Sequence, residues 1–352
     1  MTPRYLERLG DDSIVVVAED LEAERVVVIG LDDAGEEQFE HQFDGFEGQI
    51  WGSEPQGDWG QTEFYTPRLV SSSAVRGVDE LLLVVASTVY SFDPALGTLV
   101  ETPISGGGIP LPGGGYAPLE VELVAAGPDG RVATRGHNWW ADFAIFSYDP
   151  MLQVDFIKDE WGGGFVELGQ QVIRTSASGY VLSGGTTLYG QGESNGGIRA
   201  YDPDAQYSVL AVVPLVHTSW EGGFMHSAFS CMAELNDGTI AVVRGYADID
   251  GGVDPAWTAF ERWTIDDTLL SSFPLPIDAW GTTCAPAVDA SGAYIAVQDQ
   301  LVHMTPDGVP SIVADEATGM FIDVALAPGN LKVVLEEGAD GTGVVRALSI
   351  DP

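Results

Sequence analysis

Short apolar runs, separated by Gly- and Asp-rich turns, follow one another along the whole chain. Examples are SIVVVAED (13–20), LLLVVAS (81–87), TIAVVRGY (239–246) and AYIAVQD (293–299). These runs have the length of β-strands and are rich in Val and Ile, which favour strands. No stretch keeps the 3.6-residue period of an amphipathic helix. The pattern therefore predicts an all-β chain.

A turn containing Asp or Pro recurs seven times, at intervals of about 40 to 60 residues. Asp suits such turns because its side chain bonds nearby backbone, and Pro presets the backbone angle φ. A second, Gly-rich turn such as GPDGR (127–131) or LNDGT (235–239) precedes most copies. The seven copies are marked by Asp32, Asp93, Asp149, Asp202, Asp266, Asp307 and Asp351.

Each repeat therefore consists of four antiparallel strands, which is typical of β-propeller blades. An irregular β-sandwich is the alternative. The propeller hypothesis predicts one domain over residues 1–352 with seven blades, at about 3–45, 66–105, 117–158, 168–216, 227–276, 283–315 and 320–352. The last blade lacks a fourth strand before Pro352. It is then three-stranded, closed by the N-terminal segment, or truncated.

In these repeats the chain resembles the β-propeller superfamily, in particular secreted bacterial seven-bladed propellers of unassigned function. The resemblance covers nearly the whole chain and rests on the punctuation by Asp and Gly. The Trp-Asp dipeptide and Gly-His pair of WD-repeat blades are missing, and no double-Gly pattern of kelch blades recurs. The resemblance implies an architecture and no particular activity.

The charge is strongly negative, with 53 acidic against 14 basic residues and a net charge of −39. Such a chain is repelled by phosphate backbones and anionic lipids. We therefore expect neither nucleic acid nor membrane insertion, and we expect a monomer. Because the acids are spread along the chain, a solvating surface explains them better than a cluster that recruits cations.

Four connectors between blades carry a Trp shortly before the first strand of the next blade, as in DWGQTEFY (58–65). The indole rings are either exposed around the channel mouth, where they would contact a sugar, an aromatic group or a quaternary cation, or wedged between blades. The four residues are Trp59, Trp161, Trp220 and Trp280.

Two further segments are not repeated in other blades, which makes them stronger candidates for a specific role. The loop GHNWWADF (136–143) supplies His137, Trp139, Trp140 and Asp142 as ligand contacts. His226 precedes a first strand, and it is the one weak candidate for a catalytic base; a buried hydrogen-bonding role is the alternative.

The loop YADIDGGVDPAW (246–257) spaces Asp248, Asp250 and Asp254 around two glycines. Carboxylates in such a turn can surround Ca²⁺, although the spacing is not that of an EF-hand. A solvated acidic loop is the alternative, and no cofactor is required by the sequence.

The two cysteines lie at matching places in adjacent repeats. Cys231 and Cys284 each begin an innermost strand, so they form either a disulfide between blades or two small buried thiols. A disulfide favours an extracellular or periplasmic location. The first residues, MTPRYLERLG, contain no apolar leader, so that location implies a leader removed beforehand.

Two hypotheses about function follow. The first is a non-catalytic propeller that binds a small molecule, a glycan or a protein loop at the Trp-rich, acidic loop face. The second is a metal-assisted hydrolase, lactonase or lyase with a Ca²⁺-type cation in the channel. A scaffold for protein assembly is a third. No Ser-His-Asp order or HExxH motif is recognisable, and whether the chain is an enzyme stays open.

Overall fold

The computed structural model describes most of the chain, in nineteen stretches. They are residues 1–10, 12–32, 35–47, 49, 68–104, 109–110, 116–117, 120–137, 143–160, 167–189, 193–202, 209–213, 218–220, 223–248, 257–277, 284–315, 319–327, 331–338 and 342–349. Within these stretches the regular structure is β throughout, and none of it forms a helix that could cross a membrane.

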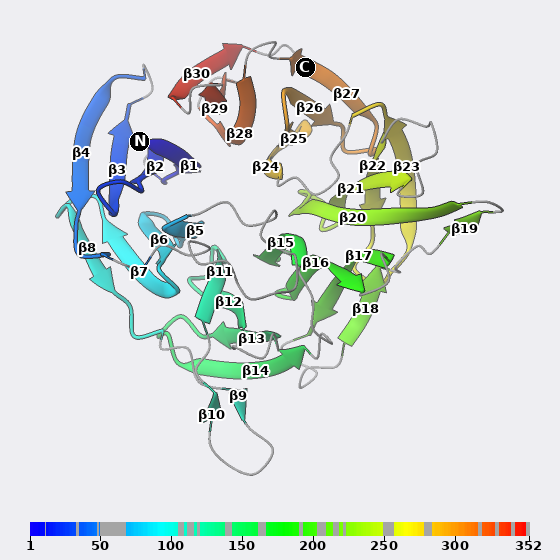
Figure 1. Cartoon of the computed structure of the whole chain (residues 1–352), viewed down its shortest axis with the longest axis horizontal. Coiled ribbons are helices and arrows are strands. Elements are labelled where there is room, and N and C mark those ends of the chain that lie inside the picture. The colour runs from blue at the N-terminus through cyan, green and yellow to red at the C-terminus, as the bar shows by residue number, and fades with distance from the viewer. Residues whose placement is uncertain are drawn as a thin grey trace. The chain divides into compact units, whose positions relative to one another are not determined.

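The first three sheets have four antiparallel strands each, hydrogen-bonded in chain order (Figure 1). They contain β1 (Thr2–Arg8), β2 (Ile14–Asp20), β3 (Arg25–Leu31), β4 (Glu37–Phe43), β5 (Val70–Arg76), β6 (Glu80–Val85), β7 (Thr88–Asp93), β8 (Thr98–Glu101), β11 (Glu120–Ala126), β12 (Val132–His137), β13 (Phe143–Tyr148) and β14 (Val154–Glu160). A small hairpin of β9 (Ile109–Pro110) and β10 (Tyr116–Ala117) precedes the third sheet.

The next four sheets have four, five, four and three strands. They contain β15 (Glu167–Arg174), β16 (Val181–Tyr189), β17 (Glu193–Tyr201), β18 (Val209–Val213), β19 (Thr218–Trp220), β20 (Gly223–Glu234), β21 (Ile240–Asp248), β22 (Trp257–Trp263), β23 (Leu269–Leu275), β24 (Cys284–Asp289), β25 (Gly292–Val297), β26 (Gln300–Met304), β27 (Pro310–Asp315), β28 (Gly319–Leu326), β29 (Leu331–Gly338) and β30 (Gly343–Ser349).

Seven successive up-and-down sheets make the chain a seven-bladed β-propeller, which confirms the predicted fold class. The last sheet is three-stranded over the described residues, in the order β28–β29–β30. The N-terminal strand β1 pairs with β2 and begins the first sheet. Closure of the last blade by the N-terminal segment is therefore not what the structure shows, because β1 belongs to the first sheet.

The chain divides into two compact units. The first unit comprises Met1–Gly164 and Ala327–Ser349, and in it β1 packs against β5 and β29 while β5 packs against β11. The second unit comprises Phe165–Leu326 and Ile350–Pro352, and in it β20 packs against β15 and β24 while β24 packs against β28. Within each unit, the first strands of successive sheets are thus neighbours.

The core is a series of apolar layers between adjacent sheets. In β6 the residues Leu81, Leu83 and Val85 pack toward the first sheet, whereas Leu82 and Val84 pack toward the third. All five are fully buried, and burial of each stabilises the fold by about 2 kcal/mol. A strand buried on both faces needs no polar alternation, which explains the unbroken apolar run.

In the second and third sheets an Asp turn joins the third strand to the fourth. Asp149 Oδ1 accepts hydrogen bonds from the backbone N–H groups of Met151 and Gln153 at 2.8 and 2.9 Å. Asp93 Oδ1 likewise accepts from Ala95 and Leu96. The predicted role of Asp in these turns is therefore confirmed at both positions.

Several turns require a residue with positive φ. Glycine supplies it at Gly35, where φ is +79° and an added Cβ would meet nothing within 4 Å. At Gly292, where φ is +130°, an added Cβ would lie 2.0 Å from the backbone oxygen of Met304. Gly292 is therefore required both by its own φ and by the adjacent strand, whereas Gly35 is required by its φ alone.

Polar side chains fix how the first strands of neighbouring sheets pack. Ser72 Oγ accepts from the N–H of Val124 at 3.1 Å and donates to its carbonyl oxygen at 3.3 Å, which joins β5 to β11. Arg76 extends from the second sheet onto two turns of the third, and it donates to the carbonyl oxygens of Gly130 and Pro150 at 2.8 and 2.5 Å.

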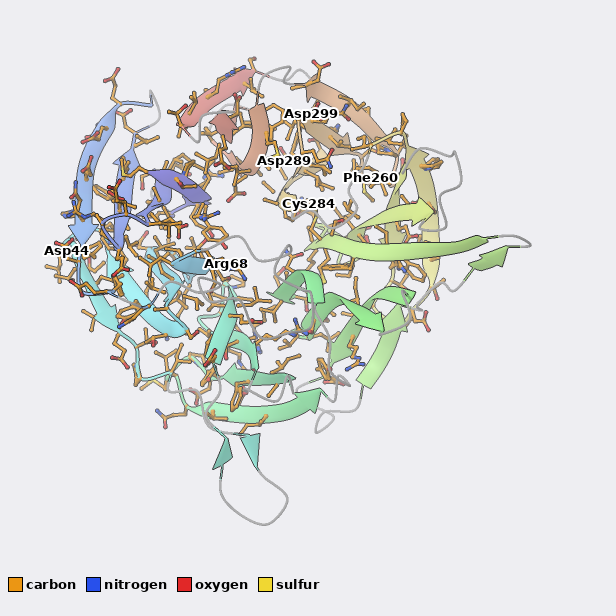
Figure 2. All side chains as sticks on the ribbon, in the orientation of Figure 1. Asp44, Arg68, Phe260, Cys284, Asp289 and Asp299 are labelled. Carbon is orange, nitrogen blue, oxygen red and sulfur yellow. A yellow bond between two sulfur atoms is a disulfide. The ribbon has the colours of Figure 1, made fainter. Side chains whose placement is uncertain are left out.

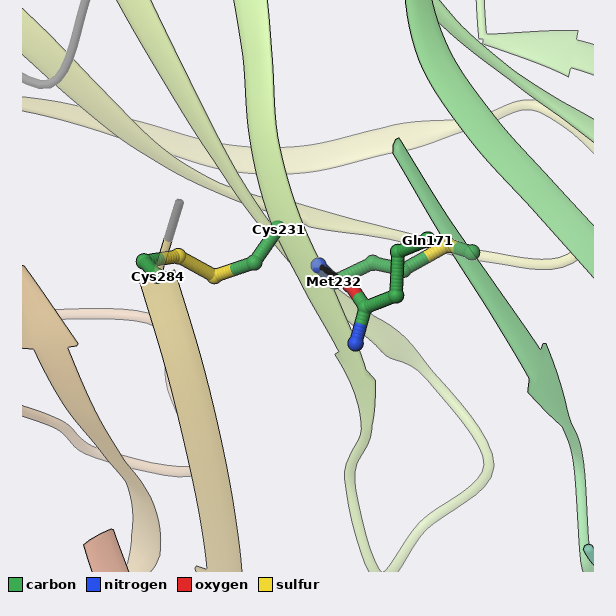
Figure 3. Close-up of a disulfide and its surroundings, with 4 residues drawn as sticks. All are labelled: Gln171, Cys231, Met232 and Cys284. Atoms are coloured by element: carbon green, nitrogen blue, oxygen red, sulfur yellow. Dashed lines mark hydrogen bonds between the residues drawn. A yellow bond between two sulfur atoms is a disulfide. The ribbon is translucent and has the colours of Figure 1, made fainter. Parts of the chain in front are cut away.

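In the second unit a disulfide joins adjacent sheets. Cys231 of β20 is bonded to Cys284 of β24, with the Cα atoms 5.5 Å apart, which confirms the predicted disulfide in place of two free thiols. On its other side β20 is held by Gln171 of β15, whose Oε1 accepts from the Met232 N–H at 2.6 Å (Figure 3).

We expect Gly35→Ala to cost about 1 kcal/mol of unfolding free energy, because alanine at positive φ is strained while the space is open. Gly292→Ala should cost at least about 3 kcal/mol, because the backbone oxygen of Met304 cannot move aside without disturbing β26. Urea unfolding of both variants measures the difference. Equal costs would contradict the packing explanation.

Replacing both cysteines by serine should lower stability by about 2–4 kcal/mol, because the disulfide closes a loop with a sequence separation of 53 residues. The measurement is thermal unfolding with and without reductant. The wild type should lose stability in reductant and the double variant should not. A wild type insensitive to reductant at full reduction would contradict this expectation.

Candidate functional site

Each sheet has two ends, and they carry different kinds of loop. We call the end where the first strand begins and the second strand ends the connector face, and the opposite end, which carries the Asp and Gly turns, the corner face. In the second sheet Arg68 and Leu69 precede β5, and the turn Ala86–Ser87 joins β6 to β7. Both lie on the connector face of that sheet, where the sequence predicts a binding site.

Most of the predicted ligand contacts lie outside the described residues. These are Trp59, Trp139, Trp140, Asp142, Trp161, Trp280, Asp250 and Asp254. The backbone of four others is described, and all four lie at the ends of strands or in an extended strand: His137, Trp220, His226 and Asp248.

Three of those four come together in the fifth sheet. Strand β20 is twelve residues long and continues beyond the usual blade to pair with β19, so that Trp220 is opposite Gly223. On the other edge of β20, His226 pairs with Ala247, next to Asp248. The connector end of one sheet therefore carries Trp220, His226 and Asp248, which sequence spacing alone does not place together.

A hollow on the connector face of the first unit was not predicted. About 220 Å³ of space lies within its outline, but most of that space is open solvent, and the enclosed part admits about one water molecule. The residues that line it are Arg68, Leu69, Ser71, Ala86, Ser87, Val121 and Glu122, and the accessible part of the lining is mostly apolar. We call it the Arg68 hollow; Arg68 lies beside β5 in Figure 2.

One wall of the Arg68 hollow is fixed by a fully buried carboxylate. Glu19 Oε2 accepts from the backbone N–H groups of Leu69 and Val70 at 2.8 and 2.9 Å. Its Oε1 accepts from Arg4 Nε at 2.6 Å. Since a buried charge needs a partner, the Arg4–Glu19 pair holds the chain directly after Arg68.

The opposite walls are joined to each other by backbone. Ala86 donates its N–H to the Leu69 carbonyl oxygen at 3.0 Å, and Val121 donates to Ser87 at 3.3 Å. Ala86 and Ser87 have φ values of +48° and +64°, which are unusual without glycine and are found at constrained sites. Ser71 Oγ donates to the backbone oxygen of Glu122 at 2.7 Å.

A Ser, a His and an Asp do lie close together in the sixth sheet, but on its corner face. Ser291 Oγ donates to Asp289 Oδ1 at 2.5 Å, and His303 Nε2 lies 3.0 Å from the Ser291 carbonyl oxygen (Asp289 is labelled in Figure 2). His303 also stacks on Tyr294 at 4.5 Å. Because the carboxylate bonds the serine and not the histidine, this arrangement closes a turn and is not a catalytic relay.

A cluster of polar side chains is buried in the fifth sheet. Glu261 Oε2 accepts from Trp263 Nε1 at 2.8 Å and lies 3.1 Å from Arg244 Nη2. Arg244 also lies 5.9 Å from the Trp263 ring centroid. All three are buried, so the group joins β21 to β22 and offers no surface to a ligand.

No group of three or more His, Cys, Asp or Glu side chains that could hold a metal ion is found in the described part of the chain. Of the three aspartates in the predicted calcium loop, only Asp248 lies in that part.

The pKa of one carboxyl group on the first strand of a sheet is strongly raised. Burial raises the pKa of Glu7 on β1 to about 7, and a hydrogen bond from Ser73 Oγ at 2.5 Å, which lowers the pKa, offsets part of that rise. The charged form is therefore disfavoured between the first strands of two sheets.

No protein-family model and no curated protein matches the chain. Its fold is similar to that of the extracellular domain of BT4673 from B. thetaiotaomicron, described as a putative one component system, with a TM-score of 0.55 and 13% identity. That similarity covers 100% of this chain, which spans only 41% of the other protein's chain.

The fold is also similar to that of an apocarotenoid oxygenase variant from Synechocystis, with a TM-score of 0.52 and 15% identity over 97% of this chain and 84% of the other. Similarities at such low identity establish the β-propeller fold and leave activity open.

We expect Glu7→Gln to stabilise the protein at pH 8 and to leave it nearly unchanged near pH 4.5. The pKa of Glu7 is raised by folding from 4.5 to about 7, so the folded state binds more protons and stability falls as pH rises through that interval. Urea unfolding at pH 4.5, 6 and 8 measures the difference between variant and wild type.

Glu22→Gln, at an exposed position on the same sheet, is the matched control because it also removes one carboxylate. If both variants changed stability in the same way with pH, burial at Glu7 would not be the cause.

Proposed function

We propose that the protein is a non-catalytic binding propeller and that its connector face contacts the ligand. The observation that carries this proposal is the Arg68 hollow, which opens on the connector face between the second and third sheets. The residues that line it stand on walls held by Glu19 and by the Ala86–Ser87 turn. Sites built on fixed strands with loops above them are typical of binding folds.

The unrepeated aromatic residues would enlarge this face. In this proposal Trp139 and Trp140 supply flat rings for a glycan, a small molecule or a protein loop, next to His137 and Asp142. The connector tryptophans, such as Trp220, add to them. The similarity to an oxygenase shows only that another propeller is an enzyme, and fold by itself does not choose.

An extracellular or periplasmic location is part of the proposal. The Cys231–Cys284 disulfide supports it, because disulfides persist in oxidising compartments. The fold similarity to an extracellular domain is consistent with it.

The test is a tryptophan-fluorescence titration with cellobiose, choline and phenol as probes for a sugar, a quaternary cation and an aromatic group. We expect saturable binding of at least one probe, and at least about tenfold weaker binding after Trp139→Ala with Trp140→Ala, since stacking contributes roughly 1–2 kcal/mol per ring. Leu96→Ala, at an exposed position on the corner face, is the control.

Elemental analysis of the same preparation tests the enzymatic alternative. A stoichiometric divalent cation that is lost on Asp248→Asn, together with metal-dependent hydrolysis of a lactone substrate, would contradict a non-catalytic role. Probe binding unaffected by the tryptophan substitutions would place the ligand elsewhere.

A further inference from the structure

We propose that the face of the fifth sheet that carries Tyr246, Asp248 and Trp257 binds a quaternary ammonium group at the connector end of that sheet. This inference rests on the proposed function and deepens it, because it names a ligand class and the strands that would recognise it.

The strand register places these three residues on one face. Tyr246 of β21 is opposite Trp257 on β22 and opposite Ser227 on β20, and Asp248 is opposite Met225 on β20. Directly opposite residues of neighbouring strands share a face, and so do alternate residues of one strand. Two aromatic residues and a carboxylate residue are therefore neighbours on a single face.

The short strand β19 adds a third aromatic residue at the edge of this face. Trp220 is opposite Gly223, and Gly223 lies two residues before Met225 on β20. In Figure 1 the β19–β20 hairpin extends past the other strands of its sheet. Trp220 is therefore on the same face as Tyr246 and Trp257, at its outer edge.

The same face continues into the core of the second unit. Phe229, two residues after Ser227 on β20, is buried and packs with Leu182 and Ile198 of the fourth sheet. An added Cβ at Gly184 of β16 would lie 2.5 Å from the Phe229 ring. The face is therefore the one that packs on the fourth sheet farther down, and it changes from apolar to aromatic and acidic toward the connector end.

The aromatic and acidic residues lie in a part of the sheet that shorter blades lack. The second strands β6 and β25 have six residues each, whereas β21 has nine. Tyr246 and Asp248 belong to the added residues at the end of β21. The core of a blade does not need them, which favours a role in binding.

The spacing on this face suits a quaternary ammonium group. Such a group has no N–H to donate, so proteins recognise it with aromatic ring faces, at up to about 6 Å from the ring centroid. Directly opposite residues such as Tyr246 and Trp257 have Cβ atoms about 5 Å apart, and Asp248 lies two residues along β21, about 7 Å away. A single cation can therefore interact with both rings and with the carboxylate.

Charge favours a cation over a sugar at this face. The chain has a net charge of −39, which attracts cations and gives no advantage to a neutral ligand. Arg244 is on the same face, opposite Phe229, but it is buried and lies 3.1 Å from Glu261. Between Arg244 and the connector end, the described positions of this face contain no Lys, Arg or His.

The test is calorimetric titration with choline at low ionic strength, because charge interactions are screened by salt. The reference ligand is 3,3-dimethylbutan-1-ol, in which a carbon atom replaces the choline nitrogen, so that shape is kept and charge is removed. We expect choline to bind at least about tenfold more tightly than this alcohol, since the rings and the carboxylate attract only the charged form.

The variants Tyr246→Leu, Trp257→Leu and Asp248→Asn should each weaken choline binding by at least about fivefold while keeping the wild-type circular dichroism spectrum. Phe224→Leu is the control for the rings, because Phe224 alternates with Met225 and so lies on the opposite face of the same sheet. Asp267→Asn is the control for the carboxylate, because Asp267 is exposed in the turn before β23, at the corner end of that sheet. Both controls should bind choline as the wild type does.

Equal binding of choline and the alcohol would overturn the cation site, and so would choline binding unchanged in Tyr246→Leu and Asp248→Asn. The absence of any heat with choline would overturn it as well. Should Trp257→Leu fail to fold, the comparison of choline with the alcohol on the wild type still decides whether charge is recognised.

The proposed function has a separate outcome. If cellobiose or phenol bound through Trp139 and Trp140 while choline did not bind, the connector face would still be a binding face without this site. If no probe of either set bound, both proposals would fail.

Discussion

The fold depends on strands that are apolar on both faces. In β6 and β25 every residue from the second position onward is buried, and a single sheet can cover only one side of such a strand. Each sheet therefore needs a neighbour on both sides, and the hydrophobic effect drives repetition of the unit. Polar contacts cannot supply this driving force, because each is worth about 1 kcal/mol net. The contacts of Ser72 and Arg76 instead fix the position of one sheet relative to the next.

That constraint explains why the fold could be predicted from the sequence. Apolar runs such as LLLVV are too short for buried helices, and Asp and Gly turns separate them at a regular interval, so sheet number and strand order followed from local chemistry. The turn at Asp149 behaves as its sequence indicates. The missing fourth strand of the last sheet was visible in the sequence, but the pairing of the N-terminal strand was not, because a strand has the same sequence pattern whichever sheet it joins.

The candidate site was only partly accessible from the sequence. Aromatic and acidic residues in unrepeated loops drew attention because they break the repeat. The Arg68 hollow could not be predicted, because Arg68, Ser87 and Glu122 come from three separate segments. Each of them is an ordinary residue in its own segment. The one local signal was VSSSAV (70–75): three hydroxyls in a row in a strand of a buried sheet indicate bonding to neighbours on both sides. The extension of β20 was missed because EGG (221–223) resembles a connector.

The Cys231–Cys284 disulfide also makes part of the second unit a closed covalent ring. A protease that cut the chain once between those two residues would leave both pieces in one molecule, with β20 still beside β24. Under tension applied to the two ends of the chain, the force would pass through the sulfur atoms, and the strands enclosed by the ring, β21 to β23, would carry none of it. Damage to that loop would then stay local, because the disulfide keeps the rest of the chain connected.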